Sequence, residues 1–140
     1  MRSNWRTGGG NASREYDPHR YEDMKIVQKI FDMMLYAYPA LAQFPKSEKF
    51  ALVADIKKTM DTVLELALEG EKKYHKKTTL RDMDVALLKL RAYIRLSMEL
   101  KFLPLHKYEV WSKMLVEIGK MLGGWIKSVE SGKPSSGDSS

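Results

Sequence analysis

The chain has 140 residues, a length typical of a single domain. Hydrophobic residues make up 44% of it and charged residues 30%, proportions that predict a folded globular protein and exclude an intrinsically disordered one. No apolar run is long enough to span a bilayer, and the N-terminal residues lack the apolar segment of a secretory signal. We therefore expect a cytoplasmic protein with no membrane partner.

The residue types that carry most enzyme and metal chemistry are scarce. Cysteine is absent, which excludes disulfides, thiolate catalysis and cysteine-ligated zinc. The histidines, His19, His75 and His106, lie far apart, and none has a second ligand at metal-site spacing. We expect no catalytic residues, no metal and no cofactor. The net charge of +6, from 24 Lys and Arg against 18 Asp and Glu, weakly favours a polyanionic partner.

Composition divides the chain into a predicted disordered N-terminal arm (1–18), a helical domain (19–130) and a flexible tail (131–140). The first helix is predicted from about residue 21 to 43, because apolar residues recur at spacings of three and four before Pro45. These residues are Val27, Ile30, Met34, Ala37, Leu41 and Phe44.

The second helix is predicted from Ser47, as its N-cap, to about Tyr74. Its apolar positions are Val53, Ile56, Met60, Val63 and Ala67. The third is predicted to open at Thr79, with Asp82 completing a variant of the capping box, and to end before Pro104.

The fourth helix is predicted over about 106–129, from an unbroken apolar stripe. The stripe consists of Tyr108, Trp111, Leu115, Ile118, Leu122, Trp125 and Val129. No alternating segment predicts a strand. Four long helices with short connections predict an all-α fold, an up-down antiparallel four-helix bundle.

The third helix has two apolar faces when its residues are placed at 100° intervals. Met83, Leu87, Leu90 and Ile94 form one face, and Val85, Leu88, Ala92 and Leu96 form the other. A peripheral helix of a monomeric bundle needs only one such face, so the second favours a homo-oligomer interface. The alternative is a wide core stripe with some exposed apolar atoms.

Two groups of cations are candidates for binding phosphate. Arg91 and Arg95 lie one turn apart between the two apolar faces, near Asp84. They are either structural ion-pair partners, which we favour for at least one of them, or a phosphate-binding ridge. The densest basic cluster comprises Lys72, Lys73, Lys76, Lys77 and Arg81, with Tyr74 available to stack on a base. Its alternative is a solvated helix end.

Gly119, Gly123 and Gly124 lie within six residues of the last helix. Each glycine inside a helix costs up to about 1 kcal/mol relative to alanine, so their presence needs a reason. We interpret Gly119 and Gly123, with the adjoining Trp125, as sites of close helix packing. The alternative is fraying near the helix end.

Two segments on the last two helices, 84–96 and 117–127, carry the elements Leu-Arg-x-x-x-Arg-Leu and Gly-x-x-x-Gly-Gly-Trp. In order and separation they resemble the accessory variability determinant (Avd) proteins of diversity-generating retroelements, and the resemblance covers roughly residues 21–130. A sister group, the four-helix proteins of intervening sequences in bacterial large-subunit rRNA, shares the bundle. The glycine–tryptophan ending is more similar to the retroelement group.

The resemblance implies a homopentameric barrel of four-helix bundles that binds a reverse transcriptase and nucleic acid, template RNA and cDNA, and has no catalytic activity. Such proteins support mutagenic retrohoming, in which error-prone cDNA replaces a variable gene segment. Arg91 and Arg95 match the third-helix arginines of the family, and the basic cluster falls where the family is basic. The N-terminal arm departs from the family's compact pattern. The alternatives are an RNA-binding protein of the rRNA group and a purely structural helical oligomer.

Overall fold

A computed structural model describes residues 18–131, with side chains from residue 25 onward. The predicted tail, apart from Ser131, and the predicted arm, apart from Pro18, lie outside the described residues. Within the described range there are four long helices and no strand, which confirms the all-α prediction. They are α2 (Pro18–Leu41), α3 (Leu52–Lys72), α4 (Lys77–Glu99) and α5 (Leu105–Ser131).

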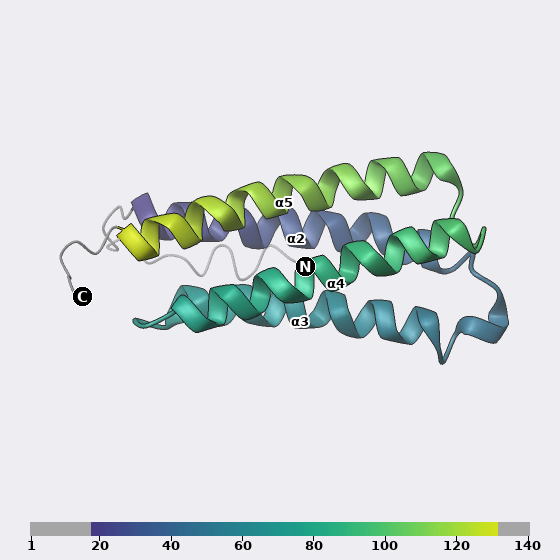
Figure 1. The fold of residues 1–140 in the computed structure, drawn as a ribbon, viewed down its shortest axis with the longest axis horizontal. Helices are drawn as coiled ribbons and strands as arrows, with labels where there is room; N and C mark the ends of the chain where they lie inside the picture. Colours follow the sequence, from purple (N-terminus) through teal and green to yellow (C-terminus); the bar gives the residue numbers. More distant parts are fainter. Residues whose placement is uncertain (1–17, 132–140) are drawn as a thin grey trace, which may run out of the picture.

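The helices run side by side as an up-down bundle (Figure 1). α2 packs against α3 and α5, and α4 also packs against α3 and α5. In the diagonal pairs, α2 with α4 and α3 with α5, no two Cα atoms come within 8 Å in the described part of the chain. The α3–α4 connection lies at one end of the bundle, and the other two connections lie at the opposite end (Figure 1). Over residues 18–131, no helix is both long enough and apolar enough to cross a membrane.

Most predicted core positions are buried. This holds for all five on α3, for Met83, Leu87, Leu90 and Ile94 on α4, and for the central residues of the α5 stripe. α2 differs by a small rotation: Ile26 and Met33 are buried, whereas the predicted Val27 and Met34 are only half-buried. At residues 26–27 and again at 33–34, two apolar residues are adjacent in the sequence. The spacing of three and four therefore did not decide which residue of each pair faces the core.

The start of α3 differs from the prediction. Residues Lys46–Glu48 form a separate short 3₁₀ helix, η2, and α3 begins at Leu52. The Glu48 carboxylate, rather than the Ser47 hydroxyl, accepts a hydrogen bond from the Leu52 backbone N–H, at 3.3 Å. A carboxylate at this position satisfies a free N–H group and suits the positive end of the helix dipole. Ser47 as the N-cap is therefore wrong.

The capping box at the start of α4 is also wrong. The helix begins at Lys77, after an N-cap residue, Lys76, whose side chain makes no capping hydrogen bond. Thr79 is buried inside the first turn, and its hydroxyl accepts a hydrogen bond from Lys73 Nζ at 3.2 Å. The threonine therefore ties the end of α3 to the start of α4.

α4 ends at Glu99, before the predicted limit at Pro104, because the backbone turns at Lys101 with a φ of 65°. The backbone N–H groups of Phe102 and Leu103 both donate to the Ser97 carbonyl, at 2.9 and 3.2 Å. This arrangement satisfies a carbonyl that the end of the helix leaves free. A left-handed residue at this point is usually glycine, so Lys101 occupies a conformation that disfavours its side chain.

Candidate functional site

The five cations predicted near the α3–α4 connection lie together at one end of the bundle. We call Lys72, Lys73, Lys76, Lys77 and Arg81 the basic junction. The end of α3 and the first turns of α4 position them, with residues 73–76 as the connection. Tyr74 is 90% exposed among these charges, and its ring meets the His75 ring edge-on, with centroids 4.7 Å apart. Its aromatic face is open to a stacking partner.

The cations of the basic junction are not equally free. Lys73 lies 3.7 Å from a Glu69 carboxylate oxygen, and Arg81 pairs with Glu130 of α5. The Lys76 ammonium lies 5.6 Å from the centre of the Trp125 ring, a cation–π contact that leaves the charge at the surface. Lys72 and Lys77 form no ion pair within residues 25–131. Lys72 and Lys77 are therefore the charges most available to phosphate.

Arg91 and Arg95 lie farther along α4 and do not join the basic junction. Ten residues separate Arg81 from Arg91, which is about 15 Å of helix rise. Arg95 makes a loose pair with Glu99, at 3.7 Å, and both side chains are largely exposed. Such surface pairs contribute little to stability. Arg91 is exposed and forms no ion pair in the described part of the chain, so neither arginine pairs with Asp84.

The second apolar face of α4 is exposed to solvent in the single chain. We call Val85, Leu88, Ala92 and Leu96 the α4 stripe. Val85 is 65% exposed and Leu96 is 44% exposed. They point away from the core, because Leu87 and Ile94 of the same helix are buried on the opposite side. In the single chain, these positions therefore lie outside the core.

A second exposed apolar surface, on α2, was missed by the sequence analysis. Phe31, Leu35 and Tyr38, here called the α2 stripe, lie one turn apart and are 52%, 60% and 44% exposed. Their spacing of four and three was a readable signal, but it was hidden by the stronger core pattern of the same helix. α2 and α4 are diagonal in the bundle, so the two stripes lie on opposite sides of the molecule.

The glycine that helix packing requires is Gly70, which the sequence analysis did not single out. It is buried near the end of α3, and a Cβ there would lie 2.9 Å from Trp125 Cη2 and 3.0 Å from Leu80 Cδ2. Trp125 is thus a packing residue, as predicted, but its close neighbour is on α3.

Gly119 and Gly123, which were predicted to be sites of close helix packing, are not tightly packed within the bundle. A Cβ on Gly119 would make an ordinary contact with Leu87, at 3.6 Å, and one on Gly123 or Gly124 would have no neighbour within 4 Å. No close approach between the helices of one chain therefore explains these glycines. Within residues 25–131, no three His, Cys, Asp or Glu side chains gather as a metal site would require.

Comparison with known proteins adds one match. The model of a family described as bAvd-like matches residues 24–129, a range that includes most of α2, all of α3 and α4, and nearly all of α5. A search of curated proteins finds no match.

Proposed function

Because the chain belongs to the bAvd-like family, we propose that it is a non-catalytic accessory protein of a diversity-generating retroelement. In this proposal it binds the retroelement's reverse transcriptase together with template RNA and cDNA, and supports mutagenic retrohoming in the cytoplasm. The observation that carries the proposal is the extent of the family match, which covers nearly the whole bundle rather than one motif. The Avd-type elements at 84–96 and 117–127 both lie inside it.

Self-association is the second part of the proposal, and the two apolar stripes support it. Water contact with Phe31, Leu35, Val85 and Leu88 is unfavourable, at roughly 25 cal/mol for each Å² of apolar surface. The stripes lie on opposite sides of one copy, so the α2 stripe of one copy can cover the α4 stripe of the next. A head-to-tail contact of this kind closes into a ring when its rotation allows. We propose that this ring is a homopentamer, the assembly that the family resemblance implies.

The basic junction is the proposed RNA-binding surface of each copy. Its available lysines contact phosphate, and the exposed Tyr74 ring stacks on an unpaired base. A ring of copies brings several such junctions together, which multiplies the local positive charge. Binding is expected to be mainly electrostatic and to weaken steeply as salt is raised.

The test is co-purification of the tagged protein with the candidate reverse transcriptase and its template-repeat RNA, followed by cDNA synthesis with and without the protein. We expect the protein to retain both partners and to increase cDNA synthesis. As a control, the same pulldown uses the Lys72→Gln, Lys73→Gln, Lys76→Gln and Lys77→Gln variant, which should keep the protein partner and lose RNA. If the unmodified protein fails to retain the reverse transcriptase, or fails to retain the RNA, that result contradicts the proposed function.

A further inference from the structure

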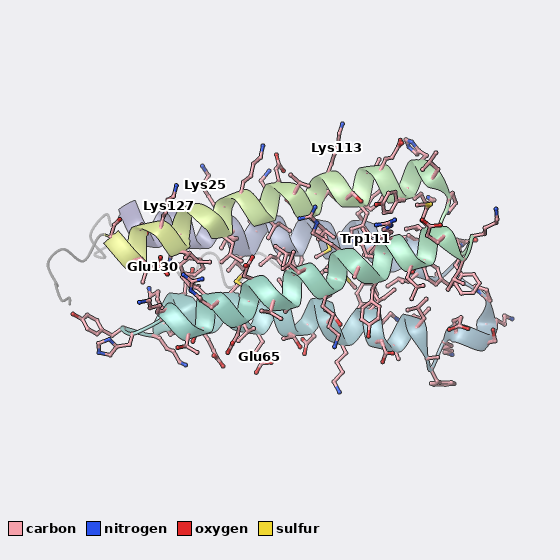
Figure 2. All side chains as sticks on the ribbon, in the orientation of Figure 1. Lys25, Glu65, Trp111, Lys113, Lys127 and Glu130 are labelled. Carbon is pink, nitrogen blue, oxygen red and sulfur yellow. The ribbon has the colours of Figure 1, made fainter. Side chains whose placement is uncertain are left out.

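A row of lysines runs along the side of α5 that faces away from the bundle. Lys113, Lys120 and Lys127 are spaced seven residues apart, so they lie on one side of the helix, two turns from each other. All three are exposed, and none forms an ion pair within residues 25–131. Figure 2 shows Lys113 extending from α5 away from α3 and α4. We call these three residues the α5 lysine row.

Two carboxylates near Lys120 and Lys127 are bound by cations of other helices, whereas Glu109, four residues before Lys113, is exposed and forms no ion pair within residues 25–131. Glu117 lies 3.2 Å from Lys29 Nζ of α2, and Glu130 pairs with Arg81 of α4. These pairs leave Lys120 and Lys127 as uncompensated charge. α3, diagonal to α5, differs, because its surface combines Lys58 with several acidic residues, Asp61, Glu65 and Glu69.

The surface of α5 between Lys120 and Lys127 is almost bare. Gly123 and Gly124 are exposed there, and a Cβ on either would meet nothing within 4 Å. Two glycines in a helix interior cost up to about 2 kcal/mol relative to alanine, and the bundle gains no packing from them. A partner outside the chain can approach the helix backbone closely at this point, between two cations.

The row continues the basic junction along the bundle. Arg81 of the junction binds Glu130 of α5, three residues after Lys127. From Lys127 the row extends 14 residues to Lys113, which is about 21 Å of helix rise.

We propose that the α5 lysine row is a second nucleic-acid contact, which binds the sugar–phosphate backbone of a strand leaving the basic junction. The inference rests on the proposed function, because it assumes that the protein binds RNA. The chemistry is that of point charges on flexible stems, which hold phosphates but read no base. The row would therefore lengthen the bound segment without adding sequence preference.

The test compares two triple variants that each remove three positive charges. Lys113→Gln, Lys120→Gln and Lys127→Gln removes the row, and Lys46→Gln, Lys49→Gln and Lys58→Gln removes exposed lysines away from it. Binding of a fluorescent mixed-sequence RNA oligonucleotide is measured by anisotropy over a series of salt concentrations. We expect the row variant to lower the magnitude of the log K against log salt slope by about 2 to 3, since each phosphate contact contributes roughly 0.7–0.9. The control variant should change it by less than one contact.

Each outcome is decisive. If the unmodified protein does not bind RNA, both the RNA-binding part of the proposed function and this inference fail. If the unmodified protein binds and the row variant keeps its slope, the inference alone fails. If the control variant lowers the salt slope as much as the row variant does, the effect is one of net charge only. If the row variant changes the oligomer mass in light scattering, the row is a contact between copies. Either result overturns the inference.

Discussion

Replacing Gly70 with alanine tests how α3 and α5 are packed together. The new Cβ would lie 2.9 Å from the Trp125 ring and 3.0 Å from Leu80, whereas attractive carbon contacts lie at about 3.5–4.0 Å. Overpacking of this kind costs about 1–3 kcal/mol, and the better helix propensity of alanine returns about 1 kcal/mol. We therefore expect a net loss of about 1 kcal/mol in the free energy of unfolding, within a range of about 0 to 2 kcal/mol.

Gly123 provides the matched control, because the same added methyl group meets nothing within 4 Å. Gly123→Ala should gain up to about 1 kcal/mol from propensity alone. Urea unfolding followed by circular dichroism, at one protein concentration, measures both variants and avoids differences caused by association. The two variants should differ by about 1–3 kcal/mol, which is the overpacking contribution.

A second substitution identifies the residue responsible. In a Trp125→Leu background the clash with the ring is gone, so Gly70→Ala should cost less than it does in the unmodified protein. This non-additivity is expected for residues in direct contact. If Gly70→Ala stabilises the protein as much as Gly123→Ala does, the Trp125 ring does not limit the size of the side chain at residue 70, and the predicted overpacking is refuted.

Three further changes test other features. The double variant Val85→Glu and Leu96→Glu should give smaller, still helical species in analytical ultracentrifugation, because burying a charge at a subunit contact is costly. The control Leu68→Glu, at a residue of α3 with similar exposure, should leave the mass of the assembly unchanged. Lys101→Gly should raise the free energy of unfolding by about 1 kcal/mol, since glycine adopts the left-handed conformation freely, and an unchanged urea midpoint would contradict this. Changing the four lysines of the basic junction to glutamine should flatten the salt dependence of RNA binding while leaving helicity intact, and an unaltered slope would make the junction a solvated helix end.

The core of α3 and the two faces of α4 were predictable from the sequence. On both helices apolar residues recur with the helical period, and burial follows directly from that period. The α4 stripe is the clearer case. Val85 and Leu96 belong to a set opposite the buried Leu87 and Ile94, so their exposure follows once one face is assigned to the core.

The helix ends were not predictable in the same way. Ser47 and Thr79 both fit the composition of caps, but at α3 it is the Glu48 carboxylate, from the preceding η2, that accepts from the Leu52 N–H, and Thr79 is buried. Which side chain reaches a free N–H group depends on the path of the preceding connection. At α3 that path contains a separate turn, η2, which no residue pattern marked.

The candidate site was predictable only in part. The basic junction is local in sequence, so its cations had to lie near one another. The α5 lysine row, the α2 stripe and the contact of Gly70 with Trp125 depend on which face of each helix the bundle covers. Gly70 and Trp125 are 55 residues apart, and only the packing of the bundle, in which the Trp125 ring reaches from α5 to α3, brings them together.

The way the bundle is closed has a consequence for how it folds. Three of its four helix contacts join neighbours in sequence, and only the contact of α2 with α5, which the Lys29–Glu117 pair bridges, joins its two ends. The α3–α4 hairpin closes through four residues, 73–76, whereas α2 and α5 are separated by the whole intervening chain. Closing that longer loop first would cost about 2–3 kcal/mol more in chain entropy. Loop closure therefore favours contacts between helices that are neighbours in sequence, and docking of α2 onto α5 completes the bundle.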